Sequence, residues 1–99
     1  MIKRVEFTND AILDYRETFD WYAKRSVIAA LNFSKAVDEA TDRVAADPEL
    51  FPIARRGYQY CILKWYPLRL VYRNEPERIL VIAVSHGKRR EGHWRRRAE

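Results

Sequence analysis

The segment from His86 to Arg97 concentrates side chains that suit contact with a polyanion. Its twelve residues include six Lys or Arg, two His and one Trp, against a single Glu. Cationic groups attract phosphates and carboxylates, and an indole can stack on a base or on a partner helix. Residues 79–85, just before it, form an unbroken apolar run, which predicts a buried strand that fixes where the basic segment begins. The residues expected to bind a target or partner are Arg89, Arg90, Trp94, Arg95 and Arg97.

Charge is distributed unevenly between the two halves of the chain. Residues 1–54 hold seven Lys or Arg and ten Asp or Glu, a net charge of −3, whereas residues 55–99 hold twelve and four, a net charge of +8. Such a field attracts nucleic acid, an acidic protein segment, or both. Composition does not choose between these partners.

Length and composition indicate one small globular domain over residues 1–99 that ends in a basic tail, 87–99. No apolar run approaches the roughly 20 residues that span a bilayer, and no signal peptide opens the chain, so we expect a cytoplasmic protein with no membrane partner. Cys61 is the single cysteine, so neither a disulfide nor a thiolate metal cluster is expected. We expect Cys61 to be a strand residue, and we expect no metal and no cofactor.

Hydrophobic periodicity predicts two helices after a short strand at the N-terminus. The strand covers residues 2–7, and the first helix runs to about Lys24. The second helix carries apolar residues at helical spacing over 30–44 and is expected to stop at Pro48. The two helices should form an antiparallel hairpin. Candidate N-caps for the first helix are Thr8, Asn9 and Asp10.

Three further strands are predicted at 60–65, 68–73 and 79–86, with turns at Tyr66-Pro67 and 74–77. The last strand is apolar on both faces and should be central or covered on both sides. This order, β-α-α-β-β-β, predicts an α+β fold in which a helical hairpin packs on one face of a mainly antiparallel sheet with an N-terminal edge strand. Alternation in the middle strand places Leu68, Leu70 and Tyr72 inward and Arg69, Val71 and Arg73 outward.

Three aromatic residues outside the tail are expected to be structural. Trp21 and Tyr22 should pack in the core or along the hairpin, because large aromatic side chains are buried on average. Trp65, which precedes Tyr66-Pro67, is expected to pack in the same way.

The chain resembles the RelE/ParE superfamily of bacterial toxins over nearly its full length. The resemblance rests on several segments in the family's order and includes an aromatic-Pro-hydrophobic-Tyr strand and a closing strand with a His-x-x-Arg segment. These segments are residues 20–22, 48–52, 65–73 and 83–90, followed by Trp94 and Arg97. The resemblance implies the toxin component, or plasmid stabilisation protein, of a type II toxin–antitoxin system. Such a toxin inhibits growth when free, is neutralised by a cognate antitoxin, and meets operator DNA only through that antitoxin.

The superfamily contains two chemistries, and the resemblance leaves both open. One branch cleaves messenger RNA on the ribosome without a metal, with side chains that activate the 2′-hydroxyl, stabilise the phosphate and protonate the leaving oxygen. Arg69 and Arg73 would share a face about 13 Å apart, and His86 could be a general acid or base at the end of the neighbouring strand. The candidate catalytic residues for this branch are Lys64, Arg69, Arg73, His86, Arg89 and His93.

The other branch inhibits DNA gyrase by binding it. Two long helices favour this branch, as does the absence of closely spaced lysines around Lys64 and of any Tyr after Tyr72. Whether the protein is an enzyme therefore depends on the branch. A third hypothesis is a non-toxic module that binds nucleic acid or an antitoxin, although no helix carries the basic stripe of a DNA-recognition helix.

Overall fold

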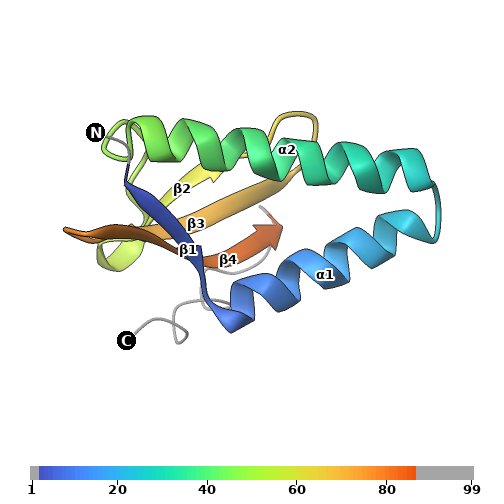
Figure 1. The fold of residues 1–99 in the computed structure, drawn as a ribbon, viewed down its shortest axis with the longest axis horizontal. Coiled ribbons are helices and arrows are strands. Elements are labelled where there is room, and N and C mark those ends of the chain that lie inside the picture. Colours follow the sequence, from blue (N-terminus) through green and yellow to red (C-terminus); the bar gives the residue numbers. More distant parts are fainter. Residues whose placement is uncertain (1–2, 87–99) are drawn as a thin grey trace.

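The computed structural model describes residues 3–86, apart from the side chain of Arg55. Its elements follow the predicted order, with one short 3₁₀ turn before the second strand. Figure 1 shows the two helices side by side along the sheet. The elements are β1 (Arg4–Phe7), α1 (Asn9–Ala23), α2 (Val27–Ala46), η1 (Arg55–Gly57), β2 (Gln59–Ile62), β3 (Leu68–Asn74) and β4 (Arg78–His86).

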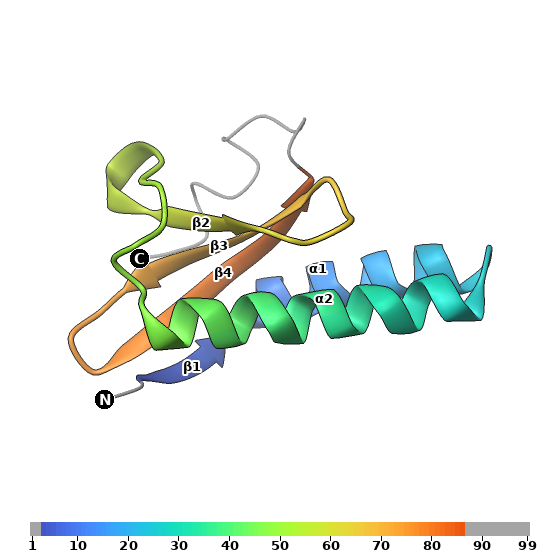
Figure 2. The same ribbon diagram turned by 90° about the horizontal axis from the view of Figure 1, so that it is seen from above.

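The sheet has the strand order β1-β4-β3-β2, which confirms the α+β prediction and the edge position of the first strand. β3 pairs antiparallel with β2 and with β4, whereas β1 pairs parallel with β4. A parallel pair needs a long connection, and the helical hairpin and two strands supply it here. Seen from above, both helices lie on one face of the sheet (Figure 2).

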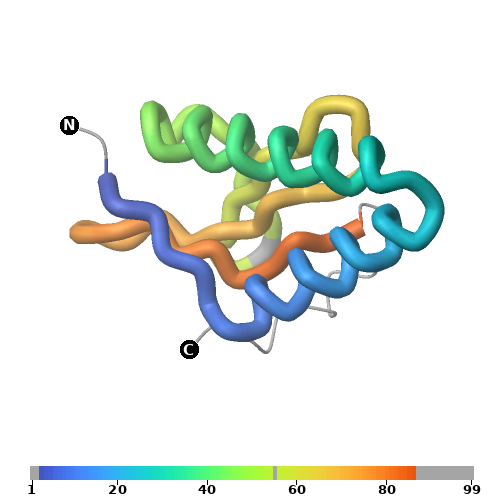
Figure 3. The backbone as a smooth tube through the Cα atoms, turned by 45° about the vertical axis from the view of Figure 1, so that its right-hand side comes forward, coloured from blue at the N-terminus to red at the C-terminus, as the bar shows by residue number. Residues whose placement is uncertain are grey.

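Each helix begins at a side chain that accepts a hydrogen bond from the first turn. The Thr8 hydroxyl accepts from the Ala11 amide at 3.1 Å, so Thr8 is the N-cap among the three candidates. The Ser26 hydroxyl accepts from the Ala29 amide at 3.2 Å, so Ser26 is the N-cap of α2, which begins after a break in the helix at residues 24–26. Figure 3 shows how this short connection reverses the chain, which forms the predicted hairpin. Among the described residues, no helix is long and apolar enough to cross a membrane.

The main core lies between the hairpin and the sheet. Phe33 on α2 is fully buried, and its ring lies 5.4 to 5.9 Å, centroid to centroid, from three tyrosine rings. These tyrosines are Tyr15, Tyr22 and Tyr66. Leu68, Leu70 and Tyr72 of β3 also face this core, as predicted. Aromatic contacts therefore join both helices to the β2–β3 connection.

A smaller apolar cluster lies on the other face of the sheet and corrects the prediction for Val71. Val71 was expected to point outward, and it does face away from the helices, but it is only 1% exposed. Tyr58, just before β2, belongs to this cluster with Val71, and Ala54 and Tyr60 pack against the cluster. Leu80, Ile82 and Ala83 complete the cluster, so β4 is buried on both faces, as its sequence predicts.

The second strand is shorter than predicted. β2 ends at Ile62, and the predicted strand residues Lys64 and Trp65 form a turn, because the chain must already reverse before β3. The Leu63 amide donates to the Leu68 carbonyl at 2.9 Å and closes this connection. Trp65 adopts φ 71°, a left-handed conformation that is uncommon for a bulky residue. Cys61 is a buried strand residue, as predicted.

Candidate functional site

His86, the last residue of β4, lines a cleft between α1 and the sheet. Leu68 of β3 is the ladder partner of His86, and both residues line this cleft on the helix side. The cleft has a volume of about 470 Å³. Its lining is Asp14, Glu17, Thr18, Trp21, Tyr22, Pro67, Leu68, Val84 and His86. His86, the last described residue, therefore lines the same cleft as two carboxylates of α1, those of Asp14 and Glu17.

Asp14 ties α1 to the last strand. Its side chain is 7% exposed, and its Oδ2 accepts a hydrogen bond from the Val84 amide at 3.1 Å. Burial of a carboxylate is costly unless hydrogen bonds replace water, and the Val84 amide is one such replacement. Asp14 thus fixes the position of the strand end at which His86 lies.

The two arginines of β3 lie on the opposite face from His86. Arg69 pairs with Ser85, one position before His86, so its side chain points away from the helices. Its guanidinium carbon lies 4.3 Å from the ring centroid of Tyr60, which packs on the outer apolar cluster. Arg73 also belongs to this outer face, because its ladder partner is Leu80 of that cluster. The structure therefore separates Arg69 and Arg73 from His86.

Lys64 lies in a third place, in the turn after β2. Its Nζ is 3.6 Å from Glu39 Oε2 of α2, and the side chain is exposed. The described candidates for catalysis are thus distributed over the β2–β3 turn, the outer face of the sheet and the α1 cleft. The remaining predicted site residues lie outside the described part of the chain. These are Arg89, Arg90, His93, Trp94, Arg95 and Arg97.

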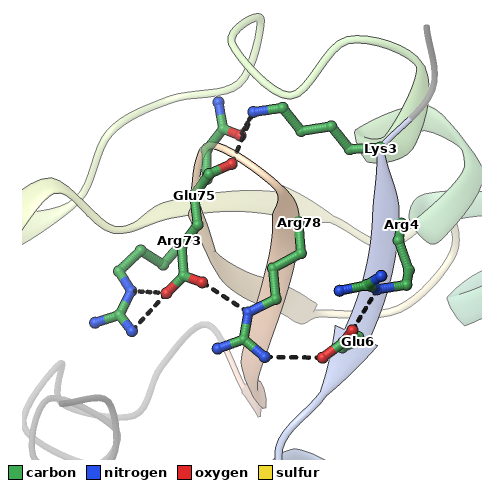
Figure 4. A network of polar contacts seen from close by, with 7 residues as sticks. Lys3, Arg4, Glu6, Arg73, Glu75 and Arg78 are labelled. Carbon is green, nitrogen blue, oxygen red and sulfur yellow. Dashed lines mark hydrogen bonds and ion pairs between the residues drawn. The ribbon is translucent and has the colours of Figure 1, made fainter.

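Arg73 takes part in a polar network at the far end of β3 and β4, which Figure 4 shows. Glu75 is its centre: Oε2 accepts from Arg73 Nε at 2.8 Å, and Oε1 accepts from Arg78 Nε at 2.7 Å. Arg78 also donates to Glu6 of β1 at 2.8 Å, and Glu6 forms an ion pair with Arg4. The network therefore joins the parallel edge strand to the β3–β4 turn.

These ion pairs lower the pKa values of the two carboxyl groups in the network, those of Glu75 and Glu6. The hydrogen bond from Arg78 is the main reason why the pKa of Glu75 lies below its ordinary value of 4.5, with Arg73 as the second contributor. The same guanidinium lowers the pKa of Glu6. Lys3 adds a fourth cation, donating to the Asn74 side chain at 2.7 Å and to the Glu75 carbonyl at 2.8 Å. From the sequence, Glu75 was identified only as a turn residue.

Two of the aromatic residues outside the tail are more exposed than predicted. Tyr22 packs on the core, but Trp21 is 52% exposed and lies along the hairpin, with the Arg25 guanidinium 3.6 Å from its ring centroid. Trp65 is 91% exposed, so the prediction that it packs in the structure is wrong. In the sequence, the polar Lys64 before Trp65 and the Tyr66-Pro67 pair after it are the features that indicate a turn including Trp65.

Comparisons with known proteins agree with this fold. Residues 5–91 match the family described as the ParE toxin of the type II toxin–antitoxin system parDE. A solved structure described as the chromosomal ParDE TA system from P. aeruginosa is similar in fold, with a TM-score of 0.63 and 18% sequence identity over 86% of this chain and 96% of that chain. A comparison with curated protein sequences finds no match. The chain belongs to the ParE toxin family of type II toxin–antitoxin systems.

Proposed function

We propose that this toxin inhibits DNA gyrase by binding it, and that its cognate antitoxin relieves the inhibition. The observation that carries the proposal is the separation of the cationic side chains. Metal-independent cleavage of RNA needs a base, an acid and phosphate-stabilising cations around one phosphodiester. Arg69 and His86 lie on opposite faces of the sheet, and Lys64 pairs with Glu39 in a different region. This arrangement favours binding over catalysis by the described residues.

The outer surface of the hairpin supports a protein as the target. Four large apolar side chains near the α1–α2 connection are at least half exposed, and exposed apolar side chains that cluster on a surface are typical of protein-binding sites. The guanidinium of Arg25, stacked on one of them, adds a residue type enriched at protein interfaces. The four residues are Trp21, Val27, Ile28 and Leu31.

The proposal is tested by two assays on one preparation of the full chain: gyrase supercoiling, and ribosome-dependent cleavage of messenger RNA. We expect supercoiling to be inhibited and messenger RNA to remain intact. Addition of the antitoxin encoded by the neighbouring gene should restore supercoiling. Unaffected supercoiling at high toxin concentration, or cleavage of messenger RNA, would contradict the proposal.

A matched pair of variants locates the binding surface. Ile28 on the hairpin is 71% exposed, and Ile53, outside the hairpin, is 73% exposed. Exposed substitutions usually change stability by less than about 0.5 kcal/mol, so both variants should fold. We expect Ile28→Ser to weaken gyrase inhibition and Ile53→Ser to retain it. Equal inhibition by both variants would exclude the hairpin as the contact surface.

A further inference from the structure

The turn after β2 presents an aromatic ring to solvent. Trp65 is 91% exposed, and among the described side chains no aromatic ring or guanidinium stacks on it. Its φ of 71° places a bulky residue in the left-handed region, which costs of order 1–3 kcal/mol. Burial of the ring does not compensate for this strain, since the ring makes little contact with the protein. The strained, exposed ring therefore indicates a role outside the folded core.

The residues on both sides of Trp65 fix the backbone of the turn. Before it, the Leu63 amide donates to the Leu68 carbonyl at 2.9 Å. After it, the Tyr66 hydroxyl donates to the Ala29 carbonyl of α2 at 2.9 Å, and the Tyr66 ring packs against Phe33 and Tyr22. Figures 1 and 3 both show this turn beside α2. The backbone position from which the indole projects is thus anchored to the main core.

A cleft of about 490 Å³ lies between this turn and α2. Two ammonium groups border it, Lys64 from the turn and Lys35 from α2. Among the described residues that line it, only Glu39 carries a carboxylate, and its Oε2 lies 2.8 Å from Arg43 Nε and 3.6 Å from Lys64 Nζ. The local charge is therefore positive. The lining residues are Asn32, Lys35, Ala36, Glu39, Lys64, Trp65 and Tyr66.

We propose that Trp65, Lys35 and Lys64 form a contact site for single-stranded nucleic acid, with a base stacked on the indole and phosphates beside the two ammonium groups. Single strands are held by exposed aromatic rings that accept any base and by cations that follow the backbone. A peptide helix instead inserts its side chains into a continuous groove. Trp65 projects from a turn with its faces open, which suits stacking. The site is independent of whether gyrase is the toxin's target.

The test measures binding of the purified full chain to fluorescein-labelled oligothymidylate and oligouridylate, each of about ten nucleotides, by fluorescence anisotropy. We expect Trp65→Ala to weaken binding about 5- to 150-fold and Trp65→Phe to retain most of it. Lys35→Ala and Lys64→Ala should each reduce the slope of log affinity against log salt by about 0.7. Comparison of the two oligonucleotides shows whether the 2′-hydroxyl contributes.

Two controls separate this site from another exposed indole and from misfolding. Trp21→Ala removes a half-exposed indole at another place and should leave oligonucleotide affinity unchanged. Trp65→Gly removes the ring while relieving the left-handed strain, so it should lose affinity as Trp65→Ala does without a lower melting temperature. Unchanged affinity in both Trp65→Ala and Trp65→Gly, or an equal loss in Trp21→Ala, would overturn the proposal. An oligoglutamate peptide that binds with the same dependence on Trp65 would overturn it too, because the surface would then recognise acidic protein.

Discussion

The carbonyl of Pro48 offers a quantitative test of the structure, because two buried side chains donate to it. The Tyr72 hydroxyl donates at 2.6 Å and the Gln59 amide at 2.8 Å. Tyr72 is fully buried and Gln59 nearly so. Burial raises the pKa of Tyr72 above its ordinary value of 10.0, so the hydroxyl stays protonated and remains a donor at neutral pH. These bonds attach the end of α2 to the sheet.

The two donors predict a non-additive loss of stability. Tyr72→Phe leaves the carbonyl with the Gln59 donor, so it should lower the free energy of unfolding by about 1 kcal/mol. Gln59→Met leaves it with the Tyr72 donor but also removes the bond from Gln59 Nε2 to the Phe51 carbonyl at 3.1 Å, so it should cost about 1–3 kcal/mol. The double variant leaves the Pro48 carbonyl without either donor. It should therefore lose about 1 kcal/mol more than the sum of the single losses.

The measurement is a double-mutant cycle by urea unfolding, with melting temperatures as a second readout. Each 1 kcal/mol should shift the melting temperature by about 4–8 °C for a chain of this size. Losses that add within about 0.5 kcal/mol would refute the reasoning, since they would mean that water reaches the Pro48 carbonyl when both donors are removed. A gain in stability from Tyr72→Phe would also refute it.

Three further predictions follow from burial and charge. Phe33→Ala empties the centre of the aromatic core, so it should lower the free energy of unfolding in urea titrations by about 3–5 kcal/mol. Val27→Ala on the exposed hairpin should change it by less than about 0.5 kcal/mol. Similar losses in the two variants would contradict the assigned core. The ion pairs of Glu75 lower its pKa in the folded state below 4.5, the ordinary value. They therefore stabilise the fold fully above pH 4.5, and this stabilisation is lost as the pH falls through the folded-state pKa. Glu75→Gln should therefore show a shallower fall in melting temperature on acidification in low salt, and a slope equal to that of the wild type would contradict this. Burial raises the pKa of the Cys61 thiol and shields it, so a thiol reagent should react only as fast as the protein opens, and reaction at the rate of a free thiol would be inconsistent with the structure.

The order and type of the elements could be predicted from the sequence because they depend on local patterns. Apolar residues at helical spacing identified both helices, and Pro48 marked the end of the second. The apolar run at 79–85 predicted a strand buried on both faces, and β4 is that strand. The end of β2 was misplaced because a run of apolar and aromatic residues continues through the turn, and periodicity alone does not show where a chain reverses.

The composition and periodicity of the chain determined its helical hairpin, its strands and the concentration of positive charge in its second half. Only the tertiary structure decided which of these charges can act together. The antiparallel register places Arg69 opposite Ser85 rather than His86, and this one-residue offset puts the arginine and the histidine on opposite faces of the sheet. The parallel pairing of β1 with β4 brings Glu6 to Arg78 across 72 positions of sequence. The register between β2 and β3 decides where the chain reverses, and the left-handed conformation of Trp65 in that turn leaves its side chain exposed.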